Sequence, residues 1–178
     1  MSNHVFDAIM TLAQDHPLQL CGLHALDSCR IEKAFRHFGH DISNEDHVLE
    51  AGLGFAVKET KPASKFGGMI GADAVKAKRN DGLDQRLMQF RLKDPDPLLY
   101  HNEAILRDGE IVGFLTGGNY GHHLGGAIGL GYVGCADAGE TAESQLQSHY
   151  QIDVAGQMVD ADVSFKPMYD PKAEQVRL

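Results

Sequence analysis

The first part of the chain carries apolar residues at helical spacing. Between residues 3 and 14 these positions are Val5, Phe6, Ile9, Met10 and Ala13. Side chains three or four residues apart share one face of a helix, so this stretch predicts an amphipathic helix with Asn3 as its cap.

A second helix is predicted over residues 23–38. Its apolar positions are Leu23, Leu26, Ile31, Ala34, Phe35 and Phe38, with charged residues between them. Gly39 follows at the position where a left-handed residue closes a helix. Around this helix, residues 18–21 and 51–57 predict two short strands, and residues 72–80 predict a third, short helix.

From residue 85 onward the pattern changes to short alternating segments, which are typical of half-buried strands. These segments cover residues 85–92, 104–106, 110–115, 127–133, 147–154 and 157–165. Asp108-Gly109 between two of them is a strong hairpin signal, because both residue types tolerate the left-handed turn conformation. No helical pattern interrupts the segments, so they favour a small antiparallel barrel or sandwich.

The chain is therefore predicted to be α+β, with two structural units. Residues 1–58 hold helices and short strands, residues 59–84 form a connector with one short helix, and residues 85–178 form the all-β unit. Lys, Gly, Ser and Pro are frequent from residue 58 to residue 71, and such a composition suits a link between units.

Charge and composition narrow the classes of partner. The 178 residues carry a formal net charge of −9, and the one basic cluster, Lys76 to Arg79, fits the last turn of a helix. An acidic chain repels the phosphates of nucleic acid. No apolar run approaches the roughly 20 residues that cross a bilayer, and no signal-peptide pattern opens the chain. We therefore expect a cytoplasmic protein without a nucleic-acid or membrane partner.

The residues alone form no catalytic or metal-binding constellation. The three cysteines lack CxxC spacing, and His122 and His123 have no Cys, Asp or Glu at ligand spacing beside them. The glycines of residues 117–126 precede no Lys-Ser or Lys-Thr pair, so they are interpreted as turn glycines of a barrel. Ser28 and Cys29 lie inside a predicted helix, away from any nucleophile elbow. We assign no catalytic residue and no metal site.

Several motifs along the chain resemble one protein family. They read ALDSCRIEKAF (25–35), LEAGLGFAVK (49–58), DPDPLLYHNE (94–103), DGEIVG (108–113) and GLGYV (129–133). In this order they resemble the aminomethyltransferase family, which includes the glycine cleavage T-protein, over nearly the whole chain. The motifs EKAFR and PLLYHNE are similar to the branch of bacterial flavin-dependent dimethylglycine and sarcosine dehydrogenase-like proteins.

The resemblance implies tetrahydrofolate as the cofactor, which takes up a one-carbon unit from a small N-methyl donor. It implies FAD only in a domain upstream of this chain. The family's catalytic carboxylate would also lie before Met1. This chain has therefore either kept an affinity for folate or lost it together with that region. The residues that the resemblance assigns to folate are Arg30, Phe35, Phe55 and Tyr169.

Each of these assignments has a structural alternative. Arg30 is also suited to a salt bridge, Phe35 and Phe55 to the core, and Tyr169 to closing the barrel. Leu26 stands where relatives often carry an arginine. If that arginine is the residue that contacts folate in the relatives, this chain lacks the contact.

Two functional hypotheses follow. In the first, the chain is the C-terminal part of a tetrahydrofolate-dependent aminomethyltransferase or dimethylglycine or sarcosine dehydrogenase-like one-carbon-transfer enzyme. It would be inactive alone, because an acid or base near the folate is missing. In the second, it is a non-catalytic binding or assembly module whose exposed helices meet a second copy or a partner protein. A third reading, that the sequence is an excerpt of a longer one, is compatible with either.

Overall fold

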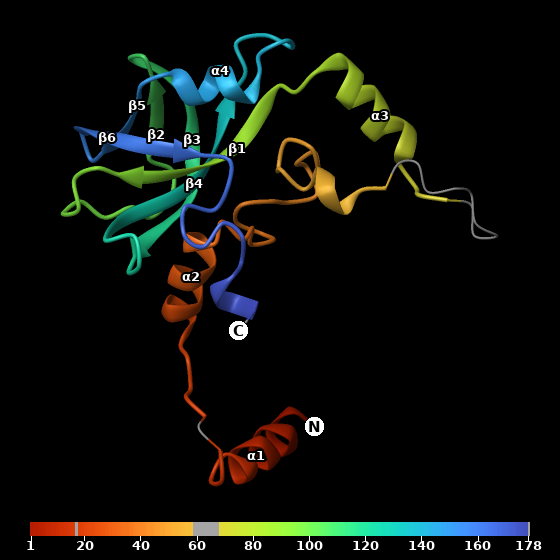
Figure 1. Ribbon diagram of the computed structural model, residues 1–178, viewed down its shortest axis with the longest axis vertical. Coiled ribbons are helices and arrows are strands. Elements are labelled where there is room, and N and C mark those ends of the chain that lie inside the picture. The colour runs from red at the N-terminus through yellow and green to blue at the C-terminus, as the bar shows by residue number, and fades with distance from the viewer. Residues whose placement is uncertain (17, 59–67, 178) are drawn as a thin grey trace.

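The computed structural model describes residues 1–16, 18–58 and 68–177. It consists of a β-barrel and an N-terminal region that extends away from it (Figure 1). The C-terminal segment returns from the barrel to the side of helix α2. Two helices, α1 (Ser2–Leu12) and α2 (Leu23–Glu32), belong to the N-terminal region, and α1 lies at its far end.

The barrel is closed and antiparallel, which confirms the predicted α+β class with a C-terminal β-barrel. Its strands are β1 (Gln85–Leu92), β2 (Ala104–Arg107), β3 (Glu110–Gly121), β4 (Gly126–Gly134), β5 (Tyr150–Val154) and β6 (Gln157–Ser164). Around the barrel their order is β1-β4-β3-β2-β5-β6. Asp108 and Gly109 both have positive φ and join β2 to β3, as the hairpin signal predicted.

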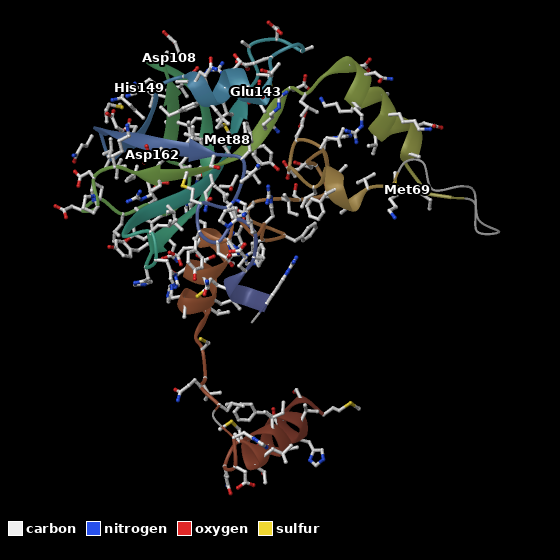
Figure 2. The ribbon with its side chains drawn as sticks, in the orientation of Figure 1. Met69, Met88, Asp108, Glu143, His149 and Asp162 are labelled. Atoms are coloured by element: carbon white, nitrogen blue, oxygen red, sulfur yellow. The ribbon has the colours of Figure 1, made fainter. Side chains whose placement is uncertain are left out.

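Alternation along the strands separates two apolar clusters. The barrel interior is filled by one set of side chains, among them Met88, labelled in Figure 2, and Phe90 of β1. Both side chains are fully buried. Successive side chains of a strand point to opposite faces. The outward positions Leu87, Ile128 and Leu130 accordingly pack against Ile31 of α2. Strands β1 and β4 are thus buried on both faces where α2 covers them.

Helix α2 ends six residues earlier than the sequence predicted. Ala34 adopts a left-handed conformation with φ of 50°, and the amide of Phe35 donates to the carbonyl of Arg30 at 2.9 Å. The amide of Ala34 also donates to the carbonyl of Ile31 at 3.0 Å, which completes a Schellman motif. Gly39, the predicted cap, lies instead in the following loop. Alanine rarely adopts this conformation, so no local pattern marked the end.

The two short strands predicted in the N-terminal region are wrong. Residues 18–21 are exposed and form no regular element, and residues 51–57 form turns with the 3-10 helix η1 (Gly54–Ala56). A strand requires a neighbour for its backbone hydrogen bonds, and none lies beside either segment in the described chain. The predicted helix over residues 72–80 is confirmed as α3 (Ala72–Asp81), whereas residues 59–67 lie outside the described residues.

Two further predictions fail within the barrel unit. The segment 147–154 is divided into the end of α4 (Ala142–Gln147) and β5, so a short helix does interrupt the strands. Thr141 caps α4, since its hydroxyl accepts the amide of Ser144 at 3.1 Å. Gly117 and Gly118 are not turn residues, because β3 continues through them to Gly121. A last 3-10 helix, η2 (Gln175–Arg177), closes the described chain.

Candidate functional site

A cleft of about 640 Å³ lies between α2 and the barrel. Side chains of α2 form one wall, strand β3 forms the second, and residues 98–101 form the third. Its lining comprises Leu23, His24, Leu26, Asp27, Arg30, His37, His40, Leu98, Leu99, Tyr100, His101, Thr116, Gly117, Gly118, Asn119 and Tyr120. The cleft is therefore assembled from the N-terminal region and the barrel together.

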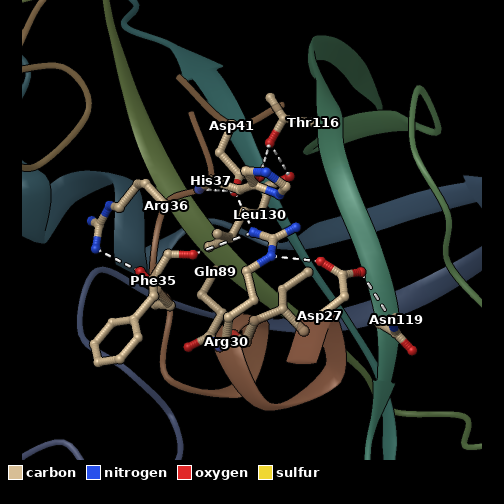
Figure 3. Close-up of polar contacts among 12 residues, drawn as sticks. Asp27, Arg30, Phe35, Arg36, His37, Asp41, Gln89, Thr116, Asn119 and Leu130 are labelled. Carbon is tan, nitrogen blue, oxygen red and sulfur yellow. Dashed lines mark hydrogen bonds and ion pairs between the residues drawn. The ribbon is translucent and has the colours of Figure 1, made fainter. Parts of the chain in front are cut away.

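Arg30 is the central charged residue of the cleft (Figure 3). Its Nε donates to Oδ1 of Asp27 at 2.6 Å, and its Nη1 donates to the carbonyl of Phe35 and to Oδ2 of Asp41. Its side chain is 11% exposed. Among the described residues Nη2 makes no hydrogen bond, and it lies beside Gly117 on the cleft wall. One face of the guanidinium is thus left for a ligand.

The carboxylate of Asp41 joins the N-terminal region to the barrel. Its side chain is fully buried. Besides Arg30, it receives the backbone N–H of His37 at 2.8 Å and the hydroxyl of Thr116 at 2.8 Å. The Thr116 hydroxyl lies 3.1 Å from the Leu130 carbonyl as well. A buried carboxylate with three donors of this kind is fully satisfied and holds Arg30 in one position.

A second carboxylate fixes the other side of Arg30. Oδ2 of Asp27 accepts the side-chain amide of Asn119 on β3 at 3.0 Å. Burial opposes ionisation of Asp27, but the Asn119 amide and the Arg30 guanidinium outweigh it and hold the pKa of that carboxyl below its ordinary value. Two carboxylates thus share the charge of Arg30, so the Nη2 edge of its guanidinium offers hydrogen-bond donors rather than an unpaired positive charge.

Histidines and apolar side chains make up much of the remaining lining. The rings of His37 and His40 lie with centroids 4.5 Å apart, and His24 and His101 also line the cleft. Tyr100 is 67% exposed at its rim. In the described ranges no group of three or more His, Cys, Asp or Glu could hold a metal ion. Flat rings beside leucine side chains form a suitable surface for a planar heterocycle.

Tyr169 belongs to a separate cluster at the C-terminal end of α2. Its ring stacks on His123 with centroids 4.1 Å apart. The buried carboxylate of Glu32 receives the backbone N–H of His123 at 2.7 Å and lies 2.8 Å from Nδ1 of the same residue. Lys33 donates to the carbonyl of Asp170 at 2.5 Å. The cluster fastens the C-terminal tail and the β3–β4 turn to α2.

The two phenylalanines assigned by resemblance lie outside the cleft. Phe35 follows the end of α2 and is 58% exposed, and Phe55 in η1 is 84% exposed. Neither is part of the core, so the core alternative is wrong for both. Of the four assigned residues only Arg30 lines the cleft, and the salt bridges that formed its alternative are present as well.

The sequence did not reveal the partners of Arg30. Asp27 stands within the ALDSCRIEKAF motif, and its spacing of three residues from Arg30 was a usable signal for an ion pair on a helix. Asp41, Thr116 and Asn119 carried no such signal, because they come from a loop and from a strand far along the chain.

Comparisons with known proteins agree with this architecture. Residues 85–170 match the glycine cleavage T-protein C-terminal barrel domain, and residues 1–61 match the GCVT N-terminal domain. Aminomethyltransferase T of the glycine cleavage system from Bartonella henselae has a similar structure, with a TM-score of 0.77 and 20% sequence identity. The match covers 95% of this chain and 45% of that one. It shows a shared fold.

Curated relatives are longer than this chain. The 4-methylaminobutanoate oxidase (formaldehyde-forming) of Paenarthrobacter nicotinovorans is 40% identical over 177 residues, which are 99% of this chain and 20% of the oxidase. Mitochondrial sarcosine dehydrogenase of Homo sapiens is 31% identical over 97% of this chain and 18% of that protein. Together the two domain matches, the relatives and the shared fold show that the chain belongs to the aminomethyltransferase family, the family of the glycine cleavage T-protein.

Proposed function

We propose that the chain is the C-terminal part of a tetrahydrofolate-dependent one-carbon-transfer enzyme of the dimethylglycine or sarcosine dehydrogenase-like branch. The observation that carries the proposal is the cleft between α2 and the barrel, with Arg30 fixed on its wall and one donor unused. Residues 1–58 would be the end of the folate-binding domain, residues 59–84 its connector, and residues 85–178 the barrel domain.

The names of two relatives support the one-carbon assignment. The oxidase from Paenarthrobacter nicotinovorans is described as formaldehyde-forming, and the human relative is a sarcosine dehydrogenase. Oxidation of an N-methyl amine releases its methyl carbon at the oxidation level of formaldehyde. In our proposal the oxidation would need FAD held by another domain, and the cleft of this chain would hold tetrahydrofolate, whose nitrogens would take up the carbon.

The lining of the cleft supports part of a folate molecule as the ligand in this proposal. Leu26 and Leu98 supply apolar wall, and Tyr100 and the histidines supply flat rings for the heterocycle. Nη2 of Arg30 is a hydrogen-bond donor to a carbonyl oxygen or ring nitrogen, because the two carboxylates already balance its charge. Tyr169, Phe35 and Phe55 lie off this wall, and folate contact by them stays a prediction from the resemblance.

We infer that the chain alone does not catalyse the transfer. The resemblance implies that the family's general acid or base is a carboxyl, which must be free to exchange a proton with the reacting nitrogen. The two carboxylates of the cleft, Asp27 and Asp41, are engaged by Arg30 and by the barrel. The residues of this chain would therefore bind and orient folate, and the proton transfer would need groups outside it.

Calorimetric titration with tetrahydrofolate tests the binding half of the proposal. The parent chain should bind, and Arg30→Gln should weaken binding by about 10-fold, the usual cost of one hydrogen bond from a charged donor. Lys93→Gln, at an exposed site on the loop after β1, is the matched control and should bind like the parent chain. Equal affinity of parent and Arg30→Gln would remove Arg30 from the site.

A transfer assay tests the other half. The chain is mixed with tetrahydrofolate and formaldehyde, which already has the oxidation level of the transferred carbon, and methylenetetrahydrofolate is followed. We expect no formation above the uncatalysed rate with this chain alone. Turnover by the isolated chain would contradict the inference that essential groups lie outside it.

A further inference from the structure

A second pocket, of about 480 Å³, lies at one end of the barrel. Parts of residues 49–54, the turn between α3 and β1, and the loop before α4 line it. Figure 1 shows α3 leading into β1 close to α4. Among the described residues, none that lines this pocket also lines the cleft beside α2. We call it the barrel-end pocket, and its volume is in the range in which proteins hold small molecules.

Arg86 at the beginning of β1 lines the barrel-end pocket and is held by neutral acceptors. Its Nη1 donates to Sγ of Cys135 at 3.0 Å and to Oε1 of Gln145 at 3.3 Å, and its Nη2 donates to the carbonyl of Glu140 at 2.7 Å. Gln145 is fully buried. These contacts fix the position of the guanidinium without balancing its charge.

The acidic groups around Arg86 are paired with other residues. Oε1 of Glu140 accepts Nη1 of Arg107 at 2.9 Å. The two arginines therefore have this one carboxylate between them. Glu50, the next carboxylate that acts on this region, lies 2.9 Å from Nζ of Lys78. In the described ranges no carboxylate forms an ion pair with Arg86, and a charged group in a partly buried place favours an oppositely charged partner.

The Cys135 thiol does not supply the missing negative charge. Burial raises the pKa of this thiol above its ordinary value, although the nearby guanidinium of Arg86 opposes that effect. The thiol is therefore protonated at pH 7 and is a weak, neutral acceptor. One positive charge at the barrel-end pocket is left for a group that enters from outside.

The unused donors of Arg86 indicate what kind of group fits. Nε makes no hydrogen bond to a described residue, and Nη2 makes one, so each keeps an N–H. Donors on two nitrogens of a planar guanidinium match the two oxygens of a carboxylate. Leu49 and Leu83 add apolar lining for a short hydrocarbon chain. We propose that the barrel-end pocket binds a small organic carboxylate, whose oxygens accept from Nε and Nη2 of Arg86.

A carboxylate suits the pocket better than a phosphate does. A carboxylate brings one negative charge, which is the charge that Arg86 leaves unbalanced. A phosphate group brings close to two at pH 7, and the second would have no partner in this cluster. The proposal concerns a site separate from the cleft, so it does not depend on whether the cleft binds folate.

Titration of the parent chain with propionate, followed by ¹H–¹⁵N NMR at constant ionic strength, tests the proposal. The backbone amides of Gly139 and Thr141 should shift and saturate with a dissociation constant on the order of 1 mM, which is usual for so small a ligand. The amides of Gly117 and Asn119 in the cleft should not move. Absence of a saturable shift at the barrel-end pocket would overturn the proposal.

Two further probes identify the chemistry that the pocket recognises. Propionamide has the shape of propionate without its charge and should cause no shift at Gly139 or Thr141. Equal binding of propionamide would make the site apolar and would contradict the role of Arg86. Inorganic phosphate should bind more weakly than propionate, and tighter binding of phosphate at the same amides would overturn the choice of a carboxylate.

Substitution of Arg86 tests its part in the site. Arg86→Gln should weaken propionate binding by at least about 10-fold, because the charged donors are lost. Arg91→Gln is the matched control, since Arg91 lies on the same strand with its side chain 39% exposed and does not line the pocket. Equal affinities of the two variants would remove Arg86 from the site. Circular dichroism verifies that both fold, and the titrations of the parent chain decide the proposal without any substitution.

Discussion

The barrel and helix α1 treat their apolar side chains in opposite ways. In the barrel, strand alternation directs Phe90 and its neighbours into an interior that is closed on every side. In α1, helical periodicity gathers an equally clear apolar face, yet Phe6 and Ile9 remain about half exposed. An apolar pattern therefore leads to burial only where a complementary surface is present. The barrel contains its own complement, and α1 does not.

Helix α2 lies between these extremes. Ile31 on its inner side is fully buried against the barrel, whereas Leu23 at its beginning is 84% exposed. The polar contacts of Asp41 and Glu32 hold this helix to the barrel. Substitutions in the three regions should therefore show how far along the chain the structure is stable by itself.

The barrel and α1 should differ most in how much stability they lose when one large side chain is removed. Phe90→Ala should lower the free energy of unfolding by about 3–5 kcal/mol, because it leaves a cavity in the closed barrel. Phe6→Ala, the same chemical change on α1, should cost less than about 0.5 kcal/mol in the free chain. Urea titration followed by circular dichroism measures both. Equal costs would show that α1 is buried after all.

The contact between the N-terminal region and the barrel should lose stability when a buried charge is removed. Asp41→Asn should cost about 2–4 kcal/mol in urea titration, because Arg30 loses its buried anionic partner and the new amide N–H₂ would face the donors of Arg30 and His37. Asp162→Asn is the control, since Asp162 is half exposed and lies 3.9–4.0 Å from its basic partners. That change should cost less than about 0.5 kcal/mol. A small effect at Asp41 would mean that the regions are held together by apolar contact alone.

A close backbone approach beside the cleft gives the third test. A Cβ added at Gly118 would lie 2.5 Å from Cβ of Leu99 and 2.6 Å from its carbonyl carbon. Gly118→Ala should therefore cost about 1–3 kcal/mol and displace residues 98–101. Gly126→Ala, where the added atom would lie 3.4 Å from the Leu92 carbonyl, should be nearly neutral. Thermal unfolding of the two variants measures the contrast.

The smallest effect should be the acid dependence of the Asp27 contact. The pKa of Asp27 is lower in the folded chain than its ordinary value of 3.8. A carboxyl of this kind adds stability that is present above the unfolded pKa and is lost as the pH falls through the folded pKa. Stability should therefore fall below about pH 4, and Asp27→Asn should flatten part of that fall. Identical pH profiles of the two proteins would argue against an ionised contact with Arg30.

Most of the barrel could be predicted from the sequence. Alternation of period two identified β1, and Asp108-Gly109 identified the hairpin, because both signals are local and need no knowledge of the fold. The limits of β3 and the helix α4 were missed, since Gly117 resembles a turn residue and α4 has only six residues. The end of α2 was missed because Ala34 takes a conformation that its neighbours in sequence do not require.

Less of the candidate site could be predicted. Arg30 was selected from a motif, and the structure places it on the wall of a cleft. Asp41 and Thr116 were not selected, because they are 75 positions apart and meet only after α2 packs on β4 and β3. Phe55 was selected as an aromatic near the ligand, and the structure places it outside the cleft in an exposed 3-10 helix.

The sequence by itself determined the family, the α+β class and the faces of the strands and helices, because motif order and periodicity are written along the chain. Only the folded chain shows which polar groups meet Arg30, that two carboxylates share its charge, and that the apolar side chains of α1 are exposed. The reason is the separation along the chain of the residues that make each contact. Periodicity states which side of an element avoids water, whereas the partner on that side depends on contacts between residues far apart in the chain.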